Sequence, residues 1–461
     1  MIVMKFGGTS VEDAAAMHRV AAIIRRELPR KPFVVLSACS GVTDELLAIA
    51  GNILQTGEDQ SLALLDRLSD RHKLIAKKLL SPECLDGVLH GLDGMFQELR
   101  NYIHGISLLG ELTNRSLDTF TSYGERCSTY IFHAALQENG LPTALIPAAE
   151  FMITDDAFMN AQPQMNIISK KVQEIIPKYS TSHDVLLTQG FIGSTKEGTT
   201  TTLGRGGSDY SAAILGAVIG VEEIQIWTDV DGMMTADPRI VSNPKRIETM
   251  SFDEAAELAY FGAKVLHPNT IYPAVQKGIP VRVLNSRNPQ SSGTLILAAN
   301  SPDQKFTDVV KSIAFKRGIT VINISSSRML MAHGFLAKLF SIFAEHRKSI
   351  DVVATSEVSV SVTIDNEEGL SEILRELEQI GEVRIARDKA IICIVGEGMK
   401  QTPGVGARIF SALGTATINI EMVSEGASEI NLTLVVSHEQ VVEAVRVLHA
   451  EFFDKQEGAC N

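Results

Sequence analysis

Apolar positions alternate between two spacings over the first 300 residues. Short apolar runs, typical of strands buried on both faces, occur at 2–6, 33–38, 185–192, 224–227 and 281–284. Between these runs, apolar residues recur every three or four positions, as expected for helices that bury one face. Strands alternating with helices predict an α/β fold, with a mostly parallel sheet covered by helices on both faces.

The rest of the chain follows another pattern, and this pattern repeats. Ile350-Asp351-Val352-Val353 is echoed by Ile420-Glu421-Met422-Val423, and each segment lies between a glycine-led apolar helix and a second apolar helix. Each copy, about 70 residues long, therefore predicts strand–helix–strand–strand–helix–strand, the ferredoxin-like βαββαβ pattern.

A polar stretch near residue 300 indicates the exit from the first domain. We expect a catalytic domain at 1–300, a first regulatory unit at 312–388 and a second at 389–461. Units with exposed sheet edges commonly pair with one another or with another subunit, so we expect a homodimer or homotetramer formed through them. A duplicated scaffold is the alternative to a regulatory role.

The composition is that of a globular protein, because 45% of the 461 residues are hydrophobic and 21% are charged. The net charge of −13 argues against broad nucleic-acid binding. The five cysteines show neither paired nor metal-type spacing, which suits a reducing compartment. No signal peptide and no membrane-length apolar run is evident. We therefore expect a cytoplasmic protein without a membrane partner.

The first strand runs directly into Gly7-Gly8-Thr9-Ser10, with a helical pattern behind it. The glycines permit a tight turn and a close approach to a ligand. The helix start that follows offers N–H groups to an anion, and Ser10 is expected to cap it. Lys5 is a charge inside an apolar strand, which costs free energy unless it is paired, and a phosphate above the turn would pair it. Taken alone, such a turn is more often purely structural.

Three other stretches carry chemistry-bearing side chains. Gly204–Asp209 combines three glycines with Arg205, whose planar fork suits a carboxylate or a phosphate. Thr228 and Asp229 follow a strand end, where open parallel sheets bind ligands, although such residues also form turns. Glu125 lies in a helical pattern. It is either a solvated helix charge or a partner for the ammonium group of an amino acid.

Four motifs, in this order, resemble those of aspartate kinases. They are Lys5-Phe6-Gly7-Gly8-Thr9-Ser10-Val11, Gly204-Arg205-Gly206-Gly207-Ser208-Asp209, Thr228-Asp229-Val230-Asp231-Gly232 with Thr235-Ala236-Asp237-Pro238-Arg239, and Gly262-Ala263-Lys264-Val265-Leu266-His267-Pro268. The resemblance covers nearly the whole chain, because the repeats resemble the paired ACT domains that follow an amino acid kinase fold in that family. It implies ATP-dependent phosphorylation of the β-carboxylate of L-aspartate to 4-phospho-L-aspartate, the first step toward lysine, threonine and methionine.

The resemblance also implies roles for individual residues. The catalytic residues it implies are Lys5, Asp209 and Lys264. The residues it places around ATP are Lys5, Gly7, Gly8, Thr9, Thr228, Asp229, Met234, Arg239 and Lys264, with Met234 standing where some relatives have tyrosine. The residues it places around aspartate are Ser37, Thr43, Glu125, Arg205 and Asp209. Magnesium should accompany ATP, but the sequence does not identify its protein ligands.

The first repeat resembles the effector site of lysine-sensitive aspartate kinases. The residues concerned are Met329, Phe335, Leu336, Ser349, Asp351, Thr355, Ser356 and Glu357. Acidic groups here suit the ε-ammonium of L-lysine, and the helix start after Gly334 suits its carboxylate. We expect inhibition by L-lysine. Threonine, or lysine acting with a second effector, remains an alternative, as does a strand edge that is merely solvated.

Two other functions remain open at this point. One is a different carboxylate kinase, such as a glutamate or acetylglutamate kinase, which the aspartate-side motifs and the paired repeats disfavour. The other is a catalytically silent amino-acid sensor, which the joint presence of Lys5, Arg205, Asp209 and Lys264 disfavours. Turnover of ATP with aspartate, compared with glutamate, separates all three.

Overall fold

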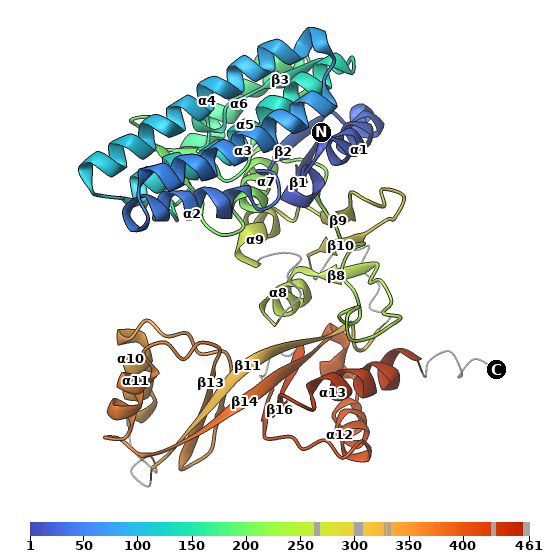
Figure 1. Cartoon of the computed structure of the whole chain (residues 1–461). Helices are drawn as coiled ribbons and strands as arrows, with labels where there is room; N and C mark the ends of the chain where they lie inside the picture. Colours follow the sequence, from blue (N-terminus) through green and yellow to red (C-terminus); the bar gives the residue numbers. More distant parts are fainter. Residues whose placement is uncertain (262–267, 299–307, 327–328, 330–332, 426–429, 455–461) are drawn as a thin grey trace, which may run out of the picture. The chain divides into compact units, whose positions relative to one another are not determined.

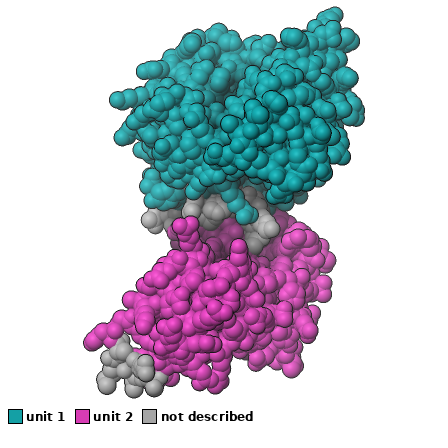
Figure 2. All heavy atoms as spheres, turned by 60° about the vertical axis from the view of Figure 1, so that its left-hand side comes forward, with its two compact units in different colours: residues 1–233, 248–252, 265–302 teal, residues 234–247, 253–264, 303–461 magenta. Residues whose placement is uncertain are grey.

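A computed structural model describes residues 1–261, 268–298, 308–326, 329, 333–425 and 430–454 (Figure 1). The chain forms two compact units, coloured separately in Figure 2. The first contains residues 1–233, 248–252 and 265–302, and the second contains residues 234–247, 253–264 and 303–461. The division into domains at 1–300, 312–388 and 389–461 stays a prediction.

An eight-stranded sheet lies at the centre of the first unit. Its strands, in spatial order, are β3 (Thr143–Leu145), β4 (Val185–Gln189), β2 (Pro32–Leu36), β1 (Ile2–Phe6), β7 (Ile224–Thr228), β9 (Val281–Asn285), β10 (Thr294–Leu297) and β8 (Thr249–Ser251). All neighbouring strands are parallel except β9 and β10. The predicted, mostly parallel sheet is therefore confirmed.

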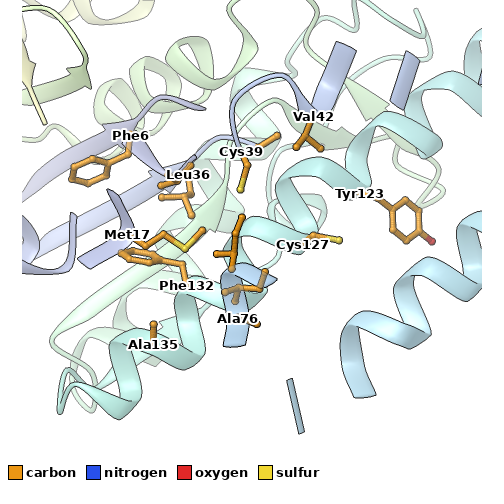
Figure 3. Close-up of a cluster of buried hydrophobic side chains, with 14 of the residues drawn as sticks. Phe6, Met17, Leu36, Cys39, Val42, Ala76, Tyr123, Cys127, Phe132 and Ala135 are labelled. Atoms are coloured by element: carbon orange, nitrogen blue, oxygen red, sulfur yellow. The ribbon is translucent and has the colours of Figure 1, made fainter. Parts of the chain in front are cut away.

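Helices cover both faces of this sheet. They are α1 (Ala14–Glu27), α2 (Val42–Gln55), α3 (Glu58–Leu79), α4 (Pro82–Leu109), α5 (Asn114–Glu138), α6 (Met165–Ser180), α7 (Gly207–Ile219) and α9 (Pro268–Lys277). Helix α8 (Phe252–Tyr260) belongs to the second unit apart from its first residue. The alternate β1 residues Ile2, Met4 and Phe6 share a core with α1 to α5, while α7 packs on the other face with α6 and α9. Figure 3 shows part of the first core, with Phe6, Leu36 and Phe132 among the labelled side chains.

Two local details differ from expectation. The strand predicted over 185–192 breaks after Gln189, because Phe191 takes a left-handed backbone conformation with φ of 65°. A short hairpin follows, made of β5 (Ile192–Ser194) and β6 (Thr200–Thr202). The cap of α1 is Asp13, which accepts a hydrogen bond from the backbone N–H of Ala16 at 2.8 Å, so the expectation that Ser10 caps this helix was wrong.

The second unit contains a six-stranded antiparallel sheet. Its strands, in spatial order, are β12 (Val353–Thr355), β13 (Ser359–Ile364), β11 (Ser312–Ser325), β14 (Glu382–Val395), β16 (Asn431–Ser437) and β15 (Met422–Ser424). Its helices are α10 (Phe335–Glu345), α11 (Leu370–Leu377), α12 (Val405–Thr415) and α13 (Val441–His449). The two predicted ferredoxin-like units are confirmed, and they share this one sheet.

The two ferredoxin-like units are threaded through each other. The long strands β11 and β14 change register near Gly318 and Asp388, which lie 70 positions apart and have φ values of 72° and 56°. Beyond the shift, β11 pairs with β13, whereas residues 312–317 pair only with the end of β14, which in turn pairs with β16. The last strand of the second ferredoxin-like unit is therefore made by residues that precede the first ferredoxin-like unit in the sequence. None of the helices in the described part of the chain combines the length and hydropathy needed to cross a bilayer.

Candidate active site

The carboxyl ends of five parallel strands meet at one edge of the first unit. The strand order runs outward from β1 in both directions, through β2 and β4 on one side and β7 and β9 on the other. Backbone hydrogen bonds tie these ends together, from Gly7 N to Trp227 O at 3.0 Å and from Ser37 N to Phe6 O at 3.1 Å. In open parallel sheets, the point where the strand order reverses is where ligands bind.

Lys5 has a partner within the chain. Its Nζ lies 2.7 Å from Oδ1 of Asp209, and the two side chains are only 12% and 14% exposed. Asp209 belongs to the first turn of α7, where the helix N-terminus favours a carboxylate. The expectation that Lys5 depends on a bound phosphate for a counter-charge is therefore corrected, because a carboxylate from another element already balances it.

Gly7 and Gly8 play different parts in the turn after β1. A Cβ on Gly8 would lie 3.0 Å from the carbonyl oxygen of Ala38 and 3.2 Å from the Cα of Ser40, so the loop after β2 packs directly on it. A Cβ on Gly7 would meet only the Lys5 ammonium at 3.4 Å and the Trp227 carbonyl at 3.5 Å, and the backbone of Gly7 is ordinarily extended. The packing therefore favours glycine at position 8 but sets no such preference at position 7.

Glu125 is a buried acid at this edge, only 3% exposed, on α5. Burial raises its pKa to about 8, while the N–H of Ala38 and the charge of Lys5 act in the opposite direction. Its Oε2 is buried and has no hydrogen-bond partner among the described residues. A carboxyl group in this state is prepared to receive a cationic ligand, because an ammonium group would satisfy the open oxygen.

The loop before α7 presents Arg205. Gly204 and Gly206 flank it with φ values of 74° and 73°, a left-handed conformation that glycine adopts at little cost. Gly207 opens the helix, and a Cβ there would lie 2.7 Å from the ring of Phe191. The Arg205 side chain is exposed, so its guanidinium is available to an anion.

Two serines that the sequence reasoning left out of the site join the strand ends. The Ser10 hydroxyl donates to the Ser286 hydroxyl at 2.9 Å, and Ser286 donates to the carbonyl oxygen of Thr228 at 3.0 Å. Both serines are about 1% exposed. No motif signalled Ser286, since only the parallel pairing of β7 with β9 brings it here.

The other predicted site residues divide into three groups. Ser37 and Thr43 lie on the loop after β2 and in the first turn of α2, and Thr228 ends β7 and donates to Asp229 at 3.2 Å. Met234 and Arg239 belong to the second compact unit, where the exposed Arg239 forms an ion pair with Asp237. Lys264, with residues 262–267, lies outside the described residues, and all these roles stay predictions.

In the second unit, the predicted effector residue Asp351 faces a lysine of its own chain. Its Oδ1 lies 2.9 Å from Nζ of Lys316 and accepts a hydrogen bond from Tyr260 at 2.8 Å. Lys316 also pairs with Asp365 at 2.8 Å, and its ammonium lies 5.3 Å from the centre of the Tyr260 ring. Asp351 Oδ2 is buried and has no hydrogen-bond partner in the described part of the chain.

The remaining predicted effector residues belong to the first repeat. Met329 and Phe335 pack against the core of this repeat, while Leu336 is 39% exposed. The others, Ser349, Thr355, Ser356 and Glu357, are exposed, and the Ser356 hydroxyl lies 2.8 Å from that of Ser359. The first repeat thus carries exposed polar groups in addition to Asp351.

Comparison with known proteins places the chain in a family. The amino acid kinase family model matches residues 1–285, and an ACT domain model matches residues 392–452. The chloroplastic aspartokinase 3 of Arabidopsis thaliana is 38% identical, over 98% of this chain and 81% of that protein. The lysine-sensitive aspartokinase 3 of Escherichia coli is 36% identical, over 98% of this chain and 99% of that protein.

A solved structure agrees with these relatives. The crystal structure of E. coli aspartokinase III in complex with aspartate and ADP has a TM-score of 0.82 at 34% identity, covering 98% of this chain and 100% of that chain. Fold, site geometry and sequence relatives all lead to one assignment. The chain belongs to the aspartokinase family.

Proposed function

We propose that this chain transfers the γ-phosphoryl group of ATP to the β-carboxylate of L-aspartate, giving 4-phospho-L-aspartate and ADP. The observation that carries the proposal is the buried Glu125, with an unpartnered oxygen and a raised pKa, at the same sheet edge as the Lys5–Asp209 pair. A cation-binding group beside a lysine suits an amino acid whose own carboxylate receives a phosphoryl group.

Aspartate is recognised at both ends of its backbone. Glu125 accepts a hydrogen bond from the ammonium group, which supplies the partner that its buried oxygen lacks. Arg205 offers two parallel N–H donors to a substrate carboxylate. Ser37 and Thr43 contribute hydroxyl groups from the loop after β2 and the start of α2.

Phosphoryl transfer needs alignment and positive charge more than covalent help from the protein. A carboxylate nucleophile is already ionised at neutral pH, so no general base is needed. Lys5 stabilises the charge of the transferred group, and the turn at Gly7, Gly8 and Thr9 lets the phosphates approach the backbone. Thr228 and Asp229 are the predicted nucleotide contacts at the end of β7, the strand that pairs directly with β1.

Magnesium is expected to enter with the nucleotide. Protein-bound magnesium commonly keeps several waters and is held by substrate phosphates with only one or two carboxylates. In this mode Asp209, a carboxylate in the first turn of α7, would hold the ion together with the phosphates. The ion would supply positive charge to the phosphates.

Trapping of the acyl phosphate tests the activity. Protein supplied with Mg-ATP and L-aspartate should form a product that hydroxylamine converts to a hydroxamate. L-Glutamate should be far poorer, because its extra methylene group moves the carboxylate out of line with the γ-phosphate. Equal rates for the two amino acids would exclude the assignment, and turnover with neither would favour a silent sensor.

The second unit is proposed to bind L-lysine at the first repeat and to lower the kinase rate. Asp351, with one buried oxygen unpartnered, and the polar groups around Ser356 support a cationic amino acid as the effector. One relative, 36% identical, is named the lysine-sensitive aspartokinase 3 of E. coli. We also propose a cytoplasmic homodimer or homotetramer formed through the regulatory units, which a solution mass measurement with and without L-lysine tests.

A further inference from the structure

Asp118 is a buried acid that the proposed reaction leaves unused. It lies on α5, two helical turns before Glu125, and its side chain is fully buried. Both of its carboxylate oxygens accept the backbone N–H of Met159 at 3.0 Å, and Oδ1 also accepts the hydroxyl of Thr202 at 2.5 Å. Burying a carboxyl group costs free energy, so we attribute the presence of this one to the hydrogen bonds that it accepts.

Asp118 joins the segments around Met159 and Thr202, and both segments lie next to the loop that carries Arg205. Thr202 ends β6, and its carbonyl oxygen accepts the N–H of Ala161 at 2.9 Å. Met159 has a φ of 72°, which is unfavourable for a side chain of its kind unless other contacts hold it.

These segments lie directly against Gly204. A Cβ on Gly204 would lie 2.8 Å from Oδ1 of Asn160 and 3.1 Å from the carbonyl oxygen of Met159. Thr202 stands only two residues before this glycine, and Arg205 follows it. The position of the arginine therefore depends on the two segments that one carboxylate holds together.

We propose that Asp118 is a positioning residue, which sets the loop Gly204–Gly207 so that Arg205 meets the substrate carboxylate. This inference rests on the proposed function, because it takes Arg205 as the group that binds aspartate. The carboxylate suits the task better than an amide, since it accepts from every side and has no hydrogen atom to oppose the Met159 N–H. A displacement of about 1 Å in such a loop misaligns the group that the loop carries.

Steady-state kinetics of Asp118→Asn in the full-length protein test this. The amide keeps the volume but places a donor against a donor, so the KM for aspartate should rise about tenfold, whereas kcat and the KM for ATP should change by less than about twofold. Thr202→Val removes only the hydroxyl donor and should raise the KM for aspartate in the same direction, by less. This second variant retains the acid and serves if Asp118→Asn folds poorly.

The matched control is Glu223→Gln. Glu223 is also a buried acid of the first unit, but it lies at the opposite end of the sheet, where it pairs with Arg30 at 3.2 Å and Arg282 at 2.9 Å. Its loss should lower the melting temperature and leave the KM for aspartate unchanged. Only Asp118→Asn and Thr202→Val should raise the KM for aspartate without raising the KM for ATP.

Two outcomes would overturn the positioning role. One is a lowered melting temperature for Asp118→Asn with an unchanged KM for aspartate, and the other is a proportional rise in both KM values. Arg205→Ala is measured in parallel. A raised KM for aspartate in Arg205→Ala without one in Asp118→Asn rejects the inference and keeps the proposed function, whereas a wild-type protein that does not phosphorylate aspartate rejects the proposed function itself.

Discussion

Glu125 illustrates how burial prepares a side chain for a charged ligand. The folded protein raises its pKa from 4.5 to about 8, with desolvation as the main cause. In the free protein, the carboxyl group therefore holds its proton at a pH where an exposed glutamate is ionised. Binding of an ammonium group supplies the missing counter-charge and favours release of that proton.

This shift predicts a pH-dependent stability. Between about pH 4.5 and 8, the folded state keeps a proton that the unfolded state has released, so the contribution of Glu125 to the free energy of unfolding falls as the pH rises. The slope is at most about 1.4 kcal/mol per pH unit. Thermal denaturation of wild type and Glu125→Gln from pH 5 to 8 should show this fall only in wild type. Parallel curves would mean that Glu125 ionises normally.

The pairing of Lys5 predicts a split between activity and stability. Lys5→Met should lower kcat by roughly 10²–10³-fold, the scale for losing one preorganised charge. It should also lower the melting temperature, because Asp209 loses its partner at 2.7 Å. The double variant with Asp209→Asn should regain stability but not activity. Full activity in Lys5→Met would remove Lys5 from the chemistry.

Several residues of the site could be found from the sequence, and others could not. Lys5 and Arg205 stand out because a charge in an apolar strand and an arginine among glycines have few structural reasons. Asp118 and Ser286 carry no such signal, since an acid in a helix and a serine after a strand are ordinary. Their place near the candidate site comes from contacts with residues 41 to 276 positions away, which no local spacing encodes.

At the scale of elements, the two glycines in the turn after β1 differ in how closely the rest of the protein packs on them. Gly8 is required by packing, because a side chain there meets the backbone of Ala38 and Ser40. Gly7 has room and an ordinary conformation, so its proposed need for glycine comes from the ligand.

Alanine substitutions should therefore behave differently. Gly8→Ala should lower the melting temperature by several degrees, whereas Gly7→Ala should leave it nearly unchanged and raise the KM for ATP. Differential scanning fluorimetry and initial rates with varied ATP measure both effects. Normal ATP kinetics in Gly7→Ala would argue against a close approach of phosphate at this turn.

Elements were predicted well where periodicity decides them and poorly where distant packing does. The apolar run over residues 2–6 is long enough to define β1, and a glycine defines the start of the first helix of each repeat, α10 and α12. The run over 185–192 is equally apolar, yet the chain turns at Phe191. The ring of Phe191 packs against Gly207 at the start of α7, and this contact is invisible in the local pattern.

At the scale of the molecule, the proposed regulation predicts inhibition by L-lysine. Initial rates should fall at millimolar or lower L-lysine, since a coupling free energy of about 1–3 kcal/mol between effector and kinase sites is sufficient. An incoming ammonium group must share Asp351 with Lys316, which already lies 2.9 Å from it. A rate that responds to threonine alone would change the effector and leave the kinase assignment intact.

Variants of exposed acids test where the effector binds. Glu357→Lys places a positive charge beside Ser356 and should abolish inhibition while sparing the uninhibited rate. Glu425→Lys makes the same change on the second repeat, where Glu425 is also exposed, and should remain sensitive. Equal loss of inhibition in both variants would contradict a site confined to the first repeat.

The interlaced regulatory units impose an order on synthesis. Residues 312–317 leave the ribosome before the first ferredoxin-like unit, yet their pairing strand, residues 390–395, is translated only after it. The first ferredoxin-like unit is continuous in sequence, so it can close while the nascent chain still carries a strand without its pairing partner. A product that stops between residues 388 and 395 should therefore expose that strand edge and self-associate. Conversely, residues 319–386 can be removed as one block without taking any strand from the second ferredoxin-like unit.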